Sequence, residues 1–134
     1  MTKGKGVGVP GRTLILLLLT AAAAACGSDG QEPIFCTQEY RAGINVEIRD
    51  AATLLPAAEG AVLTVKDGDY QEVETSTFDG LTMSAAWERA GVYDVTVTKT
   101  GYRPWFKSGV EVTADECHVQ SVQLQALLER DAGG

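Results

Sequence analysis

The sequence predicts an all-β fold, a single β-sandwich of about seven short strands, and three observations support it. Apolar and polar residues alternate with a period of two through much of residues 42–125. Turn-forming residues recur about every ten positions between these stretches. After Ala25, no stretch has the periodicity of a long amphipathic helix.

The first half of the predicted sandwich contains a hairpin. Residues 43–50 form the first expected strand, with Ile44, Val46 and Ile48 on one face. The second strand covers 61–65 and places Ala61, Leu63 and Val65 together. Asp67-Gly68 follows, a pair that tolerates positive φ in a tight turn, and Val73–Phe78 is expected to return antiparallel. A second Asp-Gly pair at 79–80 ends this strand.

The second half of the predicted sandwich shows the same alternation of apolar and polar residues, which predicts further strands. Residues 81–87 place Leu81, Met83, Ala85 and Trp87 on one inward face, and residues 91–98 do the same for Tyr93, Val95 and Val97. Val110 and Val112 continue the alternation after Gly109. The last strand is expected to begin at Cys117, and a slip in alternation between Val119 and Val122 predicts a β-bulge. The C-terminal tail covers 126–134, and its polar end, 128–134, is expected to fray.

Two stretches resemble a known family. "AGVYDVTVTKTGYRPW" (90–105) and "INVEIRDAATLLPAAEGAVLTVKDG" (44–68) resemble carboxypeptidase regulatory-like domains, which are transthyretin (prealbumin)-like Greek-key sandwiches. Thr53-Leu54 departs from the family, in which a pair such as Thr-Gly commonly precedes the proline. The resemblance covers about residues 42–125 and implies a Greek-key topology and a non-catalytic accessory module.

The N-terminal segment predicts export. Residues 1–25 carry Lys3, Lys5 and Arg12 but no acidic residue, and the run 13–25 is uncharged. A membrane-spanning helix needs about 20 apolar residues, so this run is too short to span. A basic start, an apolar centre and small final residues describe a cleaved signal peptide. The alternative, a buried core helix, would need charges at helical spacing to form a solvent face, and the run has none.

The cysteine after this run predicts a membrane anchor. "AAAC", ending at Cys26, resembles the lipobox of bacterial lipoproteins, although that pattern prefers Leu where Ala23 stands. The resemblance implies cleavage before Cys26 and lipidation of its thiol. Residues 26–41 would then be the lipidated N-terminus and a polar spacer, and Gly27 favours the outer membrane. Ordinary signal peptidase cleavage after Ala25 is the alternative.

Cysteine parity predicts a disulfide. The chain has three cysteines, and lipidation of Cys26 leaves Cys36 and Cys117 as a pair. Disulfides persist in exported proteins. The alternative is a metal site that includes Cys117 and His118, but such a site needs three or four ligands and the chain has a single histidine. We therefore expect a disulfide, no metal and no cofactor.

Charge limits the class of partner. After Cys26 the chain carries 8 basic and 18 acidic side chains, a formal net charge of −10. Such a chain repels nucleic-acid phosphates and anionic lipid surfaces. We expect a cell-envelope protein that contacts the membrane through the lipid on Cys26, with an envelope protein or a glycan as a further partner.

The expected role is a non-catalytic binding or structural module of unknown ligand. If Trp105 and Phe106 are exposed, they form the candidate binding surface; the alternative is that one ring packs inward and the other covers the end of the sandwich. Two other functions remain open. One is a small hydrolase that uses His118 with Asp115 and Glu116, and the other is an inhibitor of an envelope protease.

Overall fold

The computed structural model describes residues 33–76 and 80–133, together with Gly4, Gly6 and Gly8. The chain divides into two units, Met1–Glu32 and Pro33–Gly134. The expected signal peptide and Cys26 belong to the first unit and, apart from the three glycines, lie outside the described residues. In the described part there is no helix with the length and apolar character needed to cross a bilayer.

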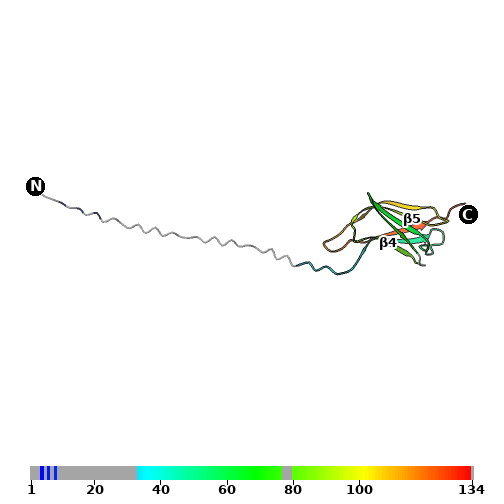
Figure 1. Cartoon of the computed structure of the whole chain (residues 1–134), viewed down its shortest axis with the longest axis horizontal. Helices are drawn as coiled ribbons and strands as arrows, with labels where there is room; N and C mark the ends of the chain where they lie inside the picture. The colour runs from blue at the N-terminus through cyan, green and yellow to red at the C-terminus, as the bar shows by residue number, and fades with distance from the viewer. Residues whose placement is uncertain (1–3, 5, 7, 9–32, 77–79, 134) are drawn as a thin grey trace. The chain divides into compact units, whose positions relative to one another are not determined.

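The second unit contains seven strands in two sheets (Figure 1). The three-stranded sheet has the order β4-β1-β7, in which β1 is antiparallel to β4 and parallel to β7. The four-stranded sheet has the order β3-β2-β5-β6, with every neighbour antiparallel. The strands are β1 (Ala42–Asp50), β2 (Val62–Asp67), β3 (Tyr70–Thr75), β4 (Thr82–Trp87), β5 (Gly91–Thr98), β6 (Trp105–Val112) and β7 (Val122–Leu128). The prediction of a seven-stranded, all-β sandwich is confirmed for the described residues.

One hydrophobic core lies on the faces that the alternation predicts. The fully buried side chains include Ile44, Val46, Ile48, Leu63, Val65, Tyr93, Val95 and Val97. The predicted hairpin is also present between β2 and β3, where Asp67 pairs with Tyr70. Its two loop residues are therefore Gly68 and Asp69, and Gly68 has a φ of 57°. Glycine suits this position because it adopts positive φ without steric cost.

Trp87 does not join the core, and this part of the prediction is wrong. The alternation places it with Met83 and Ala85, which are buried, yet Trp87 is 39% exposed. The preceding residue, Ala86, has a φ of 56°, so the backbone rotates before Trp87 and the strict alternation ends. The Trp87 ring instead stacks on Tyr40, with ring centroids 5.3 Å apart and planes 3° from parallel.

The third and last strands differ in extent from the predictions. β3 ends at Thr75, and Phe78, expected in this strand, lies outside the described residues. β7 begins at Val122 instead of Cys117 and continues to Leu128, past residue 125. No bulge forms between Val119 and Val122, because Val119 is buried before the strand and forms an isolated bridge with Ala114.

An irregularity occurs in β6 instead. Tyr93 pairs with Val110 and Val95 with Lys107, so two residues of β6 lie opposite one residue of β5. Gly109, with a φ of 66°, lies in this extra stretch. A glycine with positive φ is typical of one class of β-bulge. The bulge keeps Val110 and Val112 buried after the register changes.

Gly43, at the start of β1, gives a direct test of packing at one end of the sandwich. A Cβ atom at this position would lie 2.7 Å from the Ala86 carbonyl oxygen and 2.9 Å from Val112 Cγ1. We expect Gly43→Ala to lower the free energy of unfolding by about 1–3 kcal/mol, because overpacking displaces the neighbouring backbone. Chemical denaturation measures this change. Gly133→Ala is the control, since nothing lies within 4 Å of a Cβ there, and equal stability of the two variants would contradict the prediction.

Candidate functional site

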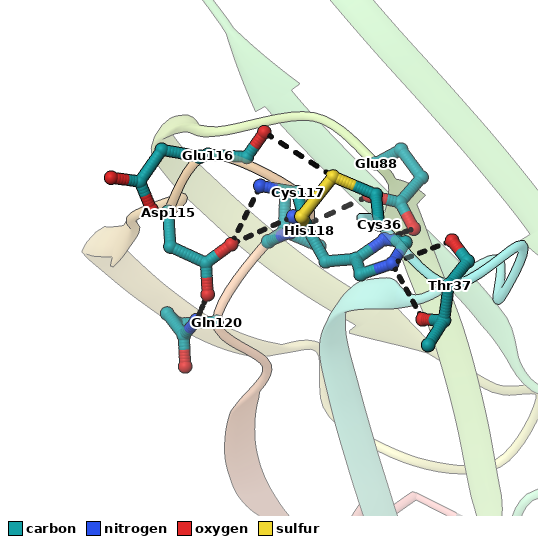
Figure 2. The surroundings of a disulfide bond; sticks show 9 residues. Cys36, Thr37, Glu88, Asp115, Glu116, Cys117, His118 and Gln120 are labelled. Carbon is teal, nitrogen blue, oxygen red and sulfur yellow. Dashed lines mark hydrogen bonds and ion pairs between the residues drawn. A yellow bond between two sulfur atoms is a disulfide. The ribbon is translucent and has the colours of Figure 1, made fainter. Parts of the chain in front are cut away.

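A disulfide attaches the segment before β1 to the end of the sandwich. We call residues 33–41 the strap; they have no regular secondary structure and are exposed. Cys36 in the strap is bonded to Cys117 in the loop before β7, with Cα atoms 5.2 Å apart (Figure 2). The predicted pairing is therefore present. It joins residues 81 positions apart and places the strap beside the loop that carries His118.

His118 lies between the strap and the end of β4. Its Nδ1 is 2.9 Å from Glu88 Oε1. Its Nε2 is 3.0 Å from Thr37 Oγ1 and 3.1 Å from the Thr37 carbonyl oxygen. Figure 2 shows the ring directed between these two residues. The side chain is only 10% exposed, so the imidazole connects elements that lie far apart in the sequence.

Glu88 is the residue on which these contacts converge. It accepts a hydrogen bond of 2.7 Å from the Arg41 backbone N–H and one of 3.4 Å from that of Val119. The Arg41 N–H, and then the His118 ring, lower the pKa of Glu88, while burial opposes them. An ionised carboxylate only accepts hydrogen bonds, so Nδ1 of His118 must carry the proton between them.

This proton position determines what Nε2 can do. In neutral His118, Nε2 has a lone pair and accepts the hydroxyl proton of Thr37; in the protonated ring, Nε2–H donates to the Thr37 carbonyl. The order of hydroxyl, imidazole and carboxylate is also that of a hydrolase triad. Here the carbonyl oxygen of Thr37 also lies 3.1 Å from Nε2, the nitrogen that would act as the base. In this arrangement Nε2 holds the strap at Thr37, while Nδ1 attaches the ring to Glu88 after β4.

Asp115 and Glu116, expected beside His118 in the hydrolase hypothesis, do not orient its ring. Oδ1 of Asp115 accepts the backbone N–H groups of Cys117 and His118, at 2.8 and 2.9 Å. These bonds, that from His118 first, lower the pKa of Asp115. Glu116 is exposed in the same loop. The Asp115 carboxylate thus shapes the turn that carries Cys117 and His118, while Glu88, distant in sequence, contacts the ring.

Trp105 and Phe106 lie toward the other end of the sandwich, where β6 begins. Trp105 packs partly against the core, whereas Phe106 is 60% exposed. Both line a surface cavity of about 250 Å³, together with Arg103, Pro104, Leu127 and Glu129. Two of these lining residues are bonded directly, since the backbone N–H of Arg103 donates to the Glu129 carbonyl at 2.8 Å. The two aromatic residues are therefore brought together at one concave site, with one ring inward and one outward.

Asp50, at the end of β1, was not singled out by the sequence. It is the buried charged residue among those described, with 3% exposure. Its Oδ1 accepts the backbone N–H groups of Ala52 and Thr53, at 2.9 and 3.0 Å. Its Oδ2 accepts the Tyr102 hydroxyl at 2.9 Å and Arg130 Nε at 2.8 Å. The Thr53 N–H, followed by the Tyr102 hydroxyl, holds the pKa of Asp50 far below its ordinary value.

These contacts fix the segment after β7. Arg130 forms an isolated bridge with Tyr102, and the backbone N–H of Asp131 donates to the Gly101 carbonyl at 3.0 Å. The expectation of fraying is therefore wrong for Leu128, which ends β7, and for residues 129–131. The one signal for Asp50 in the sequence is its position as the last residue of the first predicted strand, before a loop, and this position does not identify Arg130 as a partner.

The remaining chemistry of the described residues is limited. No three His, Cys, Asp or Glu side chains among residues 33–76 and 80–133 come together as metal ligands. No protein-family model matches the chain, and no curated protein matches its sequence. A proposed function therefore has to rest on geometry. The two relevant features are the strap that the disulfide fastens at one end of the sandwich and the aromatic-lined cavity toward the other end.

Proposed function

We propose that this chain is an exported, lipid-anchored cell-envelope protein whose β-sandwich is a non-catalytic binding or structural module. Residues 1–25 are the signal peptide and Cys26 is the lipidated residue. The sandwich has the Greek-key, transthyretin-like topology of carboxypeptidase regulatory-like domains. The observation that carries this proposal is the bond between Cys36 and Cys117, because it leaves Cys26 as the single unpaired thiol, directly after an uncharged run.

The binding surface is the cavity lined by Trp105 and Phe106. An exposed aromatic ring in a concave site can stack on an apolar side chain or on the face of a sugar ring. Arg103 and Glu129 supply a hydrogen-bond donor and acceptor at the same rim. Their ion pair of 3.5 Å is exposed, so a ligand with polar groups can compete for it with little loss of stability. An envelope protein or a glycan fits this combination.

The anchor is tested by changing Cys26 in the full chain, expressed in an export-competent bacterial host. We expect Cys26→Ala to lower the membrane-bound fraction by about tenfold or more, because two or more acyl chains are needed for stable anchoring. Intact mass of the original protein should correspond to residues 26–134 plus acyl chains and minus two hydrogens. A protein that remains in the membrane fraction after Cys26→Ala, or that retains residues 1–25, would refute the anchor.

A further inference from the structure

Four large apolar or aromatic side chains are exposed at the end of the sandwich where the strap is fastened. Ile34 is 61% exposed, Phe35 88%, Tyr40 70% and Trp87 39%. We call them the strap patch. The disulfide at Cys36 and the stack of Tyr40 on Trp87 hold the strap against this end. Tyr40 and Trp87 therefore belong to the folded domain, and Ile34 and Phe35 directly precede the disulfide that fastens the strap to it.

The position of the strap patch follows from strand register. Trp87 pairs with Ala42, the first residue of β1, whereas Trp105 pairs with Val97 near the end of β5. Gly91 at the start of β5 pairs with Val112, whose side chain is close to Gly43. The two tryptophans thus lie toward opposite ends of the sandwich. Figure 1 shows the strap, in cyan, at one end of the domain and the C-terminus at the other.

The tether limits how far this end can move from a membrane. Phe35 lies nine positions after Cys26, and a fully extended chain of that length spans at most about 30 Å. A lipid on Cys26 therefore keeps Ile34 and Phe35 within about 30 Å of the headgroups, close enough to reach them. Tryptophan and tyrosine rings are favoured at the membrane–water interface because one part of each ring system is apolar and another is polar.

Charges at the same end select the kind of surface. Glu39 forms an ion pair with Arg41, at 2.6 Å, so the strap has little free positive charge. Asp115 and Glu116 are exposed in the adjoining loop. An acidic rim is repelled by anionic lipid headgroups. A bilayer of zwitterionic lipids carries no net charge, so its headgroups do not repel the acidic rim and can accommodate the apolar patch.

We propose that the strap patch lies in the headgroup region of a zwitterionic bilayer, so that the sandwich stands with its disulfide end toward the membrane. The inference rests on the proposed anchor at Cys26 and adds an orientation to it. The cavity at Trp105 and Phe106 then faces away from the bilayer, where a partner can reach it. Residues of the fold, in addition to the lipid, contact the membrane.

The two tryptophans allow a matched test. A chain that starts at Cys26 contains the whole second unit, and with the disulfide formed its only free thiol is Cys26. That thiol is coupled to a maleimide lipid in phosphatidylcholine vesicles, with or without bromine on the acyl chains. Trp105→Phe leaves Trp87 as the reporter, and Trp87→Phe leaves Trp105. Circular dichroism and the intact disulfide mass verify the fold of each variant.

We expect brominated lipid to reduce Trp87 fluorescence by about twofold and to leave Trp105 nearly unchanged, since interfacial side chains lie about 5–10 Å into the headgroup boundary. Replacing Ile34 and Phe35 by serine should restore most of the Trp87 signal. Equal quenching of both tryptophans, or of neither, would overturn the inference. If neither is quenched and the protein sediments as a dimer, the patch belongs to a second copy of the chain.

This design separates the inference from the anchor on which it rests. The vesicle experiment supplies the tether chemically, so its result does not depend on lipidation in the cell. Intact mass of the protein made in cells tests Cys26 lipidation by itself. A lipidated protein with unquenched Trp87 refutes the orientation alone, while a quenched Trp87 in a protein that cells do not lipidate refutes the anchor alone.

Discussion

Replacing Cys36 and Cys117 together by serine is expected to lower the free energy of unfolding by about 2–5 kcal/mol. The bond closes a loop between residues 81 positions apart, and the chain-entropy model assigns roughly 4.5 kcal/mol to a loop of that length. Small domains are stable by only about 5–15 kcal/mol in total. The loss is therefore large enough to leave an appreciable unfolded population near body temperature.

The reduced strap should also leave the end of the sandwich. Without the bond, the strap is held by the contacts of His118 with Thr37, by the hydrogen bonds between Arg41 and Glu88, and by the ring stack of Tyr40 and Trp87. We expect the near-ultraviolet circular dichroism of this ring pair to weaken and proteolysis within residues 33–41 to accelerate. Denaturant titration of the double variant, in a Cys26→Ala background that removes mispairing, measures the stability.

His118→Ala in the same background is the control for this prediction. It removes contacts of the same strap but keeps the covalent bond, so it should cost less stability than loss of both cysteines. If the double serine variant unfolds at the same denaturant concentration as the original protein, the disulfide has no stabilising role. An original protein whose mass shows two free thiols in addition to Cys26 would contradict the pairing itself.

Asp50→Asn is expected to lower the melting temperature by roughly 5–10 °C, and Asp50→Ala by more. The asparagine oxygen can still accept the N–H groups of Ala52 and Thr53. Its NH₂ group, however, faces the donors of Tyr102 and Arg130, which lose their acceptor. Removing one partner of a buried ion pair destabilises the fold, because the remaining charge has lost its counter-charge. Thermal unfolding of the original protein, Asp50→Asn and Asp50→Ala at pH 7 measures the order of their melting temperatures.

The same substitution predicts a pH dependence. The pKa of Asp50 is depressed in the folded protein, mainly by the Thr53 N–H and the Tyr102 hydroxyl. A depressed carboxyl pKa stabilises the fold above the unfolded pKa, near 4, and this contribution is lost as the pH falls further toward the folded pKa. The stability difference between the original protein and Asp50→Asn should therefore be constant from pH 7 to about 5 and shrink at lower pH.

Asp94→Asn is the matched control, because Asp94 is an exposed carboxylate on β5. Its melting temperature should stay within about 2 °C of that of the original protein, as is usual for exposed substitutions. A pH-independent difference between the original protein and Asp50→Asn would show that Asp50 is not held ionised by its partners. Arg130→Gln should have a smaller effect than Asp50→Ala, because the Arg130 side chain is 66% exposed.

Much of the core could be predicted from sequence because a regular strand has a fixed period. In β1, β2 and β5 every second side chain points to the same face, so Ile44, Leu63 and Tyr93 could be assigned to the interior without knowing their partners. Glycine in the hairpin and cysteine parity added the turn and the disulfide. These signals depend on local geometry or on counting, and neither requires the register of distant strands.

The candidate sites were predicted less completely, for two physical reasons. Trp87 is exposed because Ala86 adopts a positive φ, which an alanine in a sequence does not indicate. The ring of His118 contacts Glu88 and Thr37 instead of the side chains of Asp115 and Glu116, because the disulfide brings the strap over the end of β4. Both outcomes depend on contacts between residues that lie far apart in the chain.

The sequence by itself determined that the described chain forms β strands and which faces they bury, since period-two alternation is a local property. The pairing of Cys36 with Cys117 followed from counting three cysteines and assigning Cys26 to a lipid. The tertiary structure alone decided that Asp50 meets Arg130, that the bulge lies at Gly109 and that the strap patch gathers at one end. Those features depend on sheet order and register, which are selected by the packing of the whole core and not by any single segment.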